Sequence, residues 1–255
     1  MHPQTAAHPT SSDVTVINRT FYDALWAKAH LERPDRFNTW PIVSRLLPSA
    51  AARLEVGPGL RPRLPVAGTH FVDLSAPAIA RLRAGGGIAS LGEIDVLPFG
   101  DQQFDLVCAF DVIEHITNDR QVFGELSRVL KDNGVLICSV PVHAHLWRPF
   151  DDWVGHVRRY DPPELLALLA SNGLTVEQTA VYGMQPTNPR LLNAGMWWLN
   201  NHRRWAMFWY NWVGMPLAMR FQKRLTLVSG MIDTTGVDEV LLVCRRGVRS
   251  SSHAA

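Results

Sequence analysis

The sequence predicts a doubly wound α/β fold, in which a seven-stranded sheet ends in an antiparallel hairpin. Three observations predict it. An apolar run ends in the glycine turn at 53–59, strand-like and helical segments alternate from there to residue 183, and two strand-like runs at 175–181 and 239–245 flank a long insertion. The chain has 255 residues, of which 47% are hydrophobic, and this is enough to bury one such core.

The elements follow in chain order. Hydrophobic runs predict strands at 53–56, 71–73, 88–91, 105–110, 135–140, 175–181 and 238–245. Helices are predicted at 77–83, 119–131 and 161–172. Asn133-Gly134 provides an end signal for the second helix, and Asp161 with two following prolines provides a start signal for the third. Ligands of such sheets bind at the carboxyl ends of the strands.

The first 50 residues precede the sheet. Residues 1–13 are polar and rich in Pro, Ser and Thr, so we expect a disordered tail. Residues 14–50 are predicted to form a helical cap, with helices at 16–30 and 36–47. Tyr22 lies on the first of these helices. It is either a packed helix residue or part of a lid over the site.

The glycine turn predicts a ligand site. Gly57 and Gly59 permit a tight turn that a ligand can approach closely, and Glu55 places a carboxylate beside it. A carboxylate suits a cationic ammonium group and repels a pyrophosphate. A dinucleotide fingerprint needs a third glycine, but Pro62 occupies that position. The turn therefore favours an amino-acid-like ligand over NAD.

The connection after this turn is short. Pro62 and Pro65 restrict the segment before Phe71, so we expect the first helix of the fold to be cut to about one turn. Arg61 and Arg63 are then candidates to replace the contacts of that helix.

The ordered set of motifs resembles the class I S-adenosylmethionine-dependent methyltransferases, in the small-molecule branch. The set comprises Glu55-Val56-Gly57-Pro58-Gly59, Phe71-Val72-Asp73-Leu74, Gly92-Glu93-Ile94, Phe104-Asp105-Leu106-Val107, Asp111-Val112-Ile113-Glu114-His115 and Val129-Leu130-Lys131-Asp132-Asn133-Gly134. The resemblance covers residues 53–183 and 239–244. It implies S-adenosylmethionine as the cofactor and a Rossmann-like methyltransferase fold.

The resemblance also implies roles for single residues. Glu55, Gly57 and Gly59 are expected to hold the methionine part of the cofactor, and Asp73 the ribose hydroxyls. Glu93 is expected at the adenine amino group, with Asp95 as the rival acid. The other cofactor-binding residues that we predict are Leu74, Ile94, Phe110 and Asp111.

Asp111, Glu114 and His115 are spaced so that one helical turn would bring them to one face. Such a run holds a divalent metal in some ubiquinone-pathway O-methyltransferases, but Glu-His pairs also occur in relatives without metal. We therefore predict no metal. His115 is then a candidate general base or a residue that closes the cleft.

Residues 141–160 follow the fifth strand, where this fold places acceptor contacts. His156 is a candidate base, and the alternative is that His156 and Arg158 tie the loop to Asp151 or Asp152. The substrate-binding residues that we predict are Tyr22, His143, Trp147, Arg159 and Tyr160.

Residues 184–236 form an insertion before the last strand, predicted as two helices broken near Gly214-Met215-Pro216. Residues 178–232 contain no acidic residue and six basic ones, which leaves −4 for the remainder of a chain with net charge +2. Five tryptophans accompany them. We expect a lid over the acceptor pocket for a lipophilic substrate; packing on the sheet, a homodimer contact and peripheral membrane contact are the alternatives.

Composition excludes several classes. Outside the insertion no general basic surface indicates a nucleic-acid partner. Cys108, Cys138 and Cys244 fall in predicted strands and are expected to be buried thiols. We recognise no signal peptide and no run of 18 apolar residues, so we expect a cytoplasmic protein that does not span a membrane. The predicted function is methyl transfer to oxygen or nitrogen of a small, largely apolar acceptor. The alternatives are a non-catalytic cofactor-binding protein and a methyltransferase for membrane lipids or quinones.

Overall fold

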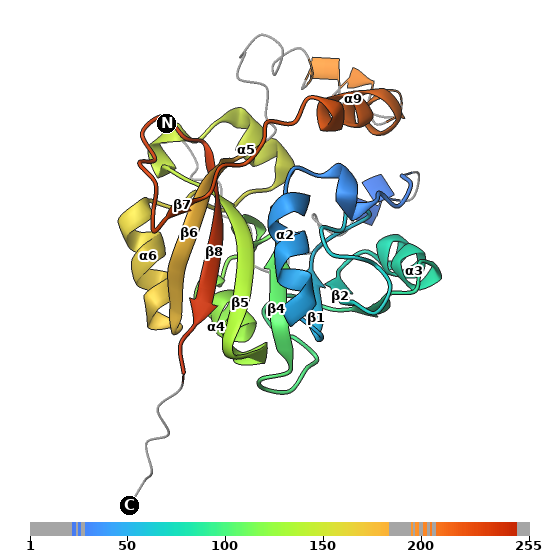
Figure 1. Cartoon of the computed structure of the whole chain (residues 1–255). Coiled ribbons are helices and arrows are strands. Elements are labelled where there is room, and N and C mark those ends of the chain that lie inside the picture. Colours follow the sequence, from blue (N-terminus) through green and yellow to red (C-terminus); the bar gives the residue numbers. More distant parts are fainter. Residues whose placement is uncertain are drawn as a thin grey trace, which may run out of the picture.

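The structure is a computed structural model that describes residues 22, 23, 25, 26, 29–183, 195, 197, 198, 201, 202, 205 and 208–248 (Figure 1). The predicted tail at 1–13 and most of the first predicted helix lie outside these residues. Within them, eight strands form one mixed sheet in the order β3-β2-β1-β4-β5-β8-β6-β7. The predicted α/β class is confirmed, and the count exceeds the prediction by one short strand.

The strands are β1 (Arg53–Val56), β2 (His70–Asp73), β3 (Ile88–Leu91), β4 (Phe104–Ala109), β5 (Leu130–Pro141), β6 (Leu174–Tyr182), β7 (Val228–Ser229) and β8 (Glu239–Arg246). The first five pair in parallel, whereas β8 runs antiparallel between β5 and β6. The predicted pairing of the two strands that flank the insertion is therefore present. The additional strand, β7, comes from the insertion and pairs antiparallel with β6 at the sheet edge.

The helices are α2 (Trp40–Leu46), α3 (Ala76–Ala84), α4 (Asp119–Val129), α5 (Pro149–Val154), α6 (Pro162–Ser171) and α9 (Met215–Arg220), with short 3₁₀ turns at Pro34–Arg36, Leu47–Ser49, Ile113–His115 and Ala144–Leu146. On one face of the sheet, α4 and α6 bury Phe123 and Leu165 against the central strands. On the other face, α2 buries Val43 against β4 and β5, in front of the sheet in Figure 1. The core thus lies between two helical layers.

The connection from β1 to β2 contains no helix among residues 57–69, all of which are described. The expected single helical turn is therefore wrong. The segment instead folds as successive turns, in which Leu60 and Leu64 are fully buried. Arg63 does take over packing contacts, because its guanidinium lies 3.7 Å from the Phe37 ring centre and 5.5 Å from that of Phe110.

A single buried carboxylate holds this helix-free connection. Both oxygens of Glu55 accept hydrogen bonds from Arg63 N, at 2.8 and 3.0 Å, and Oε2 also accepts one from Leu64 N at 2.9 Å. Glu55 is 1% exposed. Burial is the main cause that raises its pKa to about 7, against the lowering effect of these hydrogen bonds. Glu55 therefore satisfies backbone donors that a helix would otherwise satisfy.

Two local predictions need correction. The helix α4 ends at Val129, and Asn133 adopts a left-handed conformation (φ 61°) inside β5, near a register shift between β4 and β5. Asn133-Gly134 is thus a turn signal within the strand rather than a helix cap. Asp161 precedes α6 but makes no capping bond, because its carboxylate accepts from Ala144 N instead.

The remaining sequence expectations concern the cysteines and the membrane. The three cysteines are buried free thiols. Among the described residues, no helix combines the length and the apolar character that crossing a bilayer requires.

The buried Glu55 predicts a pH dependence of stability. Its pKa is about 7 in the folded protein and 4.5 in a model compound, so the folded state binds the proton more tightly. The stabilisation from that proton is complete below pH 4.5 and is lost as the pH rises through 7. Between pH 4.5 and 8, wild type should therefore lose on the order of 3 kcal/mol relative to Glu55→Gln. Urea denaturation across this range measures the difference.

The exposed Glu164→Gln, on α6, is the matched control for this comparison. Its unfolding free energy should run parallel to that of wild type at every pH. Parallel curves for Glu55→Gln as well would show that the buried carboxyl does not titrate as stated.

Candidate active site

Four loops meet at the carboxyl ends of the parallel strands. They follow β1 at Gly57, β2 at Leu74, β4 at Phe110 and β5 at Val142. Because all four strands run in the same direction, these loops lie at one edge of the sheet, the upper edge in Figure 1. The sequence-predicted cofactor and acceptor residues are distributed over these loops.

The glycine loop is tied directly to Asp73. Gly57 and Gly59 have φ values of 62° and 54°, in the left-handed region that favours glycine. Gly57 N donates to Val72 O at 2.8 Å, and Gly59 N donates to Asp73 Oδ2 at 2.8 Å. Ser75 N donates to the other oxygen, Oδ1, also at 2.8 Å. Asp73 is 7% exposed, and burial raises its pKa to about 6.

The described N-terminal residues lie across this loop. A Cβ atom on Gly59 would be only 2.2 Å from the Trp26 ring, so this glycine makes room for the indole. Asp23 accepts a hydrogen bond from Ser75 Oγ at 2.7 Å. Tyr22 places its hydroxyl 3.2 Å from His115 Nε2. The hydrogen bond of Tyr22 leaves both of its predicted roles open, packed helix residue or part of a lid.

On the adenine side, the predicted residues have different surroundings. Glu93 is exposed in the loop after β3, and the neighbouring Ile94 is buried. Leu74 is half-buried. Phe110 packs in the core with Tyr182, at 6.2 Å between ring centres. Its contacts therefore show a packing role, and its contact with a cofactor stays a prediction.

The turn after β4 does not bring Asp111, Glu114 and His115 to one face as predicted. Asp111 takes a left-handed conformation (φ 53°), and its carboxylate accepts from Ser139 Oγ at 2.6 Å. Glu114 and His115 lie in the 3₁₀ turn and are buried. One donor atom from each of Glu114, His115 and His156 falls within 4.8 Å of the others, so His156 occupies the place expected for Asp111.

The two histidines of this cluster have defined tautomers. Gly155 O can only accept, so His115 Nδ1 donates to it at 3.1 Å and Nε2 accepts from the Tyr22 hydroxyl. Burial, and then the neighbouring His156, lower the pKa of His115 to about 3. A group with this pKa is a weak base at neutral pH. His115 therefore fits the role of hydrogen-bond partner of Tyr22 better than that of general base.

His156 is held by a residue that the sequence offered only as a structural alternative. Burial would raise the pKa of Asp151, but hydrogen bonds from His156 and Arg159 lower it, so the carboxylate is ionised. It can then only accept, and His156 Nδ1 donates to Asp151 Oδ1 at 2.8 Å. The free Nε2 lies 3.7 Å from Glu114 Oε1, which is too long for a hydrogen bond. Glu114 Oε2 is buried with no hydrogen-bond partner in the described structure. A histidine oriented by a carboxylate with its other nitrogen free is the arrangement of a general base.

Three predicted acceptor residues have other roles. The side chain of Arg159 is 1% exposed and forms two hydrogen bonds of 3.0 Å with Asp151. The buried pair gives Arg159 a structural role, and its contact with substrate stays a prediction. Tyr160 is also buried in the core, near Phe123, and its predicted acceptor contact stays a prediction. Trp147 is exposed and donates to Asp152 at 3.1 Å.

His143 lies at the edge of the site in a left-handed conformation (φ 65°) and donates from Nε2 to Thr234 O at 2.7 Å. Together with His145 and Asp161 it forms a second group with metal-donor spacing. Its predicted contact with the acceptor stays a prediction.

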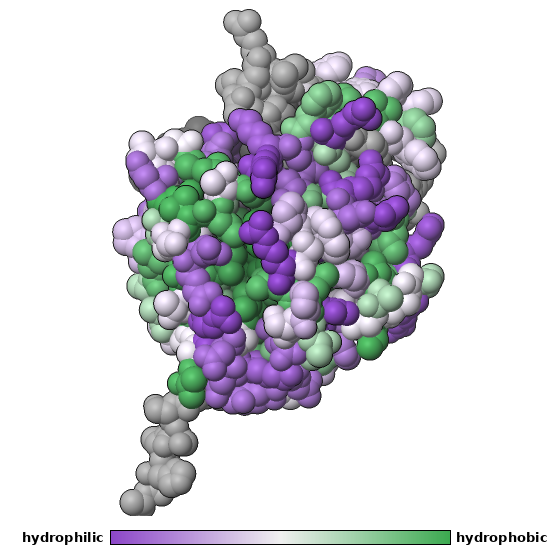
Figure 2. Space-filling view, in the orientation of Figure 1, coloured by the Kyte–Doolittle hydropathy of each residue, from purple (hydrophilic) through white to green (hydrophobic). Residues whose placement is uncertain are grey.

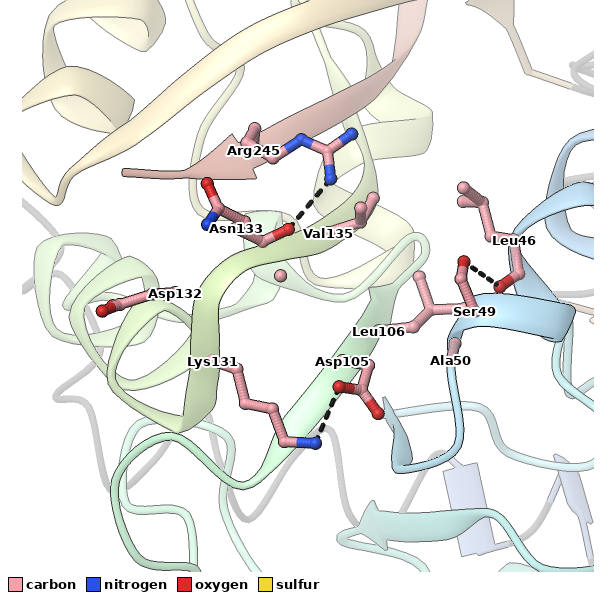
Figure 3. Close-up of a pocket in the computed structure, with 11 residues that line it drawn as sticks. Leu46, Ser49, Ala50, Asp105, Leu106, Lys131, Asp132, Asn133, Val135 and Arg245 are labelled. Carbon is pink, nitrogen blue, oxygen red and sulfur yellow. Dashed lines mark hydrogen bonds and ion pairs between the residues drawn. The ribbon is translucent and has the colours of Figure 1, made fainter. Parts of the chain in front are cut away.

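A cavity of about 180 Å³ lies at the opposite end of the sheet (Figure 3). Its lining includes Asp105 at the start of β4 and Val135 near the start of the paired part of β5. In Figure 3 Lys131 is paired to Asp105 and Arg245 is bonded to Asn133 O, whereas Asp132 has no partner among the residues drawn. The cavity is therefore remote from the loops that carry the predicted site.

Comparison with known proteins relates part of the chain to one family. Residues 54–138, from β1 into β5, match a family model described as a methyltransferase domain. This range contains the glycine loop, Asp73, Glu93 and the Glu114-His115 turn. This part of the chain is therefore similar to the S-adenosylmethionine-dependent methyltransferases.

Two curated relatives are similar to parts of the chain. A probable S-adenosylmethionine-dependent methyltransferase of Mycolicibacterium smegmatis is 34% identical over 90 residues, which are 34% of this chain and 35% of the relative. A mitochondrial ubiquinone biosynthesis O-methyltransferase of Dictyostelium discoideum is 46% identical over 39 residues, 15% of this chain and 12% of the relative. The matches thus span about a third or less of these relatives.

Solved structures share the fold over nearly the whole chain. A possible histamine N-methyltransferase of Thermotoga maritima has a TM-score of 0.57 and 15% identity, covering 91% of this chain and 95% of its own. The cyclase SpnF has a TM-score of 0.57 and 14% identity, covering 95% and 98%. At this identity the likeness shows the fold alone.

The residues at this edge of the sheet fit S-adenosylmethionine in their chemistry. Asp73 keeps a second lone pair on each oxygen after accepting from Gly59 N and Ser75 N, so a diol can still bind. Exposed Glu93 beside buried Ile94 provides an acceptor next to an apolar surface. The fit differs at Glu55, because its oxygens already accept from two loop amides; its predicted contact with an ammonium group stays a prediction.

The contact between Gly59 and Trp26 predicts a stability effect. Gly59→Ala adds a methyl group where the indole lies, in a backbone conformation that alanine disfavours. We expect a loss of about 2–4 kcal/mol in the free energy of unfolding, the sum of the conformational and steric costs. Faster hydrogen exchange at Tyr22 to Trp26 should accompany it.

Gly173→Ala is the matched control, because Gly173 has φ 71° and no atom within 4 Å of the added methyl group. It should lose only the conformational part, about 1–2 kcal/mol. Equal losses for the two variants would contradict the packing of Trp26 on the glycine loop.

Proposed function

We propose that this protein transfers a methyl group from S-adenosylmethionine to an oxygen or nitrogen of a small, largely apolar acceptor. The observation that carries the proposal is the convergence of two groups at one sheet edge. The first is the glycine loop hydrogen-bonded to Asp73, and the second is His156 oriented by Asp151. The first suits the family's cofactor and the second suits removal of a proton.

Asp73 would hold the ribose, Glu93 the adenine amino group, and the loop at Gly57 and Gly59 the methionine part. The bound sulfonium supplies a methyl group that is already electrophilic. The chain has to align the acceptor with that methyl group and exclude water. Tyr22 and Trp26 support exclusion of water, because both lie over the loops that would hold the two reactants.

His156 would take the proton of a neutral hydroxyl or of an ammonium group. Its Nδ1–H is fixed on Asp151, so the lone pair of Nε2 faces the cluster with Glu114 and His115. We propose that this step needs no metal ion. Two observations support this: Asp111 is bonded to Ser139, and the Tyr22 hydroxyl already occupies His115 Nε2.

The fold also admits other chemistry, since a solved neighbour is a cyclase. A protein that binds the cofactor without methyl transfer is thus the second candidate. A panel of hydroxyl and amine acceptors with methyl-labelled cofactor separates the two. Label in any product supports transfer, and tight cofactor binding without label across the panel supports the second candidate.

Asp73 should dominate cofactor affinity. Asp73→Asn replaces a charged acceptor by a neutral one, and we expect S-adenosylhomocysteine to bind with about 2–3 kcal/mol less free energy, roughly 30- to 150-fold weaker. Calorimetry measures this. Glu93→Gln should weaken binding less, because Glu93 is exposed.

Asp95→Asn is the control for this series, because Asp95 is the rival acid in the same loop. It should leave affinity within twofold of wild type. Unchanged affinity for Asp73→Asn would exclude the ribose assignment, and a large loss for Asp95→Asn would transfer the adenine role to Asp95.

His156 should dominate proton removal. For a hydroxyl acceptor, His156→Gln should lower kcat by about 10²–10⁴ while cofactor affinity stays unchanged. His115→Gln should have a smaller effect on kcat, because its low pKa makes it a poor base. Stopped-flow or steady-state turnover at several pH values measures both.

A chelator provides the control for the role of His156. Wild-type turnover should be unchanged in EDTA. Loss of turnover that magnesium or zinc restores would make Glu114, His115 and His156 metal ligands instead.

A further inference from the structure

The insertion presents a surface of large aromatic side chains that the core does not use. We call the following set the aromatic surface: Trp197 (61% exposed), Trp205 (67%), Phe208 (50%), Trp209 (45%), Trp212 (55%) and Phe221 (75%). These exposures contradict the alternative that the insertion packs its aromatic residues on the sheet. Large aromatic residues that gather on a surface mark a site of interaction.

Ring contacts join four members of the aromatic surface, Trp205, Phe208, Trp209 and Trp212. Phe208 touches Trp205, Trp209 and Trp212, with ring centres 6.5, 6.5 and 6.2 Å apart. Residues 205, 208, 209 and 212 follow the spacing of one helical stripe. The π-helical turn at Tyr210–Gly214 passes directly into α9 at Met215, so the helix type changes where the interruption near Gly214 was predicted. In Figure 2 hydrophobic residues reach the surface over α9.

The charge around this surface is of one sign. Residues 178–232 carry six basic residues and no acid. Arg220, Lys223 and Arg224 are exposed, and within the described chain no ion pair involves them. A symmetric contact with a second copy would bring these cations together, which costs free energy. An anionic bilayer complements both the charge and the aromatic rings, because tryptophan favours the depth of lipid headgroups.

The aromatic surface is connected to the segments beside the candidate active site. Trp212 lies 5.7 Å from the His30 ring, and Asn38 bonds to Gln222 Oε1 at 2.8 Å and Lys223 O at 2.9 Å. In Figure 1, α9 stands beyond the sheet edge at which the strands β1, β4 and β5 end. If the aromatic surface rested on a partner, the candidate active site would therefore face that partner.

We propose that the aromatic surface, with Arg220, Lys223 and Arg224 at its border, docks this protein peripherally on anionic lipid bilayers. Docking is interfacial: fifteen residues separate Arg204 from Arg220, and they include Gly214 and Pro216. The proposal goes beyond the proposed function. Docking would let the protein take an apolar acceptor from the bilayer. Binding to the bilayer itself does not require methyl transfer.

Flotation with vesicles tests the proposal without any assay of transfer. The full chain should float with vesicles of phosphatidylglycerol and phosphatidylcholine at low salt, and should stay unbound with phosphatidylcholine alone. Each basic residue near an anionic surface changes partitioning by roughly fivefold, so Lys223→Gln/Arg224→Gln should weaken it by about 25-fold. Trp205→Ser/Trp212→Ser should also weaken it at least tenfold.

Matched controls are available on the body of the domain. Arg81→Gln/Arg120→Gln removes two exposed cations from α3 and α4, and Leu166→Ser removes an exposed apolar side chain from α6. Both should float like wild type. Equal losses in the control and test variants would overturn the proposal, since the surface would then have no special role.

Sedimentation equilibrium without lipid tests the alternative that a second copy of the chain covers the aromatic surface. A monomer that floats supports docking on the bilayer. A dimer that Trp205→Ser/Trp212→Ser dissociates, together with wild type that stays unbound to anionic vesicles, overturns the proposal and makes the aromatic surface a contact between copies.

Discussion

The hydrogen bonds of Glu55 to the Arg63 and Leu64 amides are the interaction on which the site depends. A parallel pair such as β1 and β2 is ordinarily joined through a helix, which satisfies its own backbone donors. Here residues 57–69 contain no helix, and a buried carboxylate satisfies two of these donors. Burial of the charge costs free energy, as the raised pKa of Glu55 shows. The loop at Gly57 and Gly59 is held against β2 by its own hydrogen bonds to Val72 O and Asp73.

The consequences reach the second half of the chain. With no helix after β1, Arg63 fills the space between Phe37 and Phe110 and bonds to the hydroxyl of Tyr182 on β6. Trp26 also packs on the glycine loop, and the Tyr22 hydroxyl is hydrogen-bonded to His115. The cofactor side, the N-terminal cap and the proposed base are therefore parts of one contact network. The aromatic surface joins the same network through His30 and Asn38.

The sequence was sufficient for the centre of the sheet, because β4, β5 and β8 are largely buried runs rich in apolar residues. β1 and β3 have the predicted bounds, and Asp73 ends β2 as predicted. It was insufficient for side-chain pairing in the 141–160 loop. Asp151 is followed by Asp152, and Arg158 by Arg159. Spacing alone does not tell which residue of each pair is buried. Asp151 five residues before His156 was the available signal, but its pairing with Arg159 depends on the fold of α5.

A crystal structure with S-adenosylhomocysteine bound tests the account most directly. We expect both ribose hydroxyls to bind the Asp73 carboxylate and the bound sulfur to lie on the same side as His156. We also expect Glu55 to keep its hydrogen bonds to the Arg63 and Leu64 amides. A ribose held elsewhere would contradict it. A Glu55 carboxylate that leaves the two amides to bind the ligand's ammonium group would equally contradict the role given to that interaction.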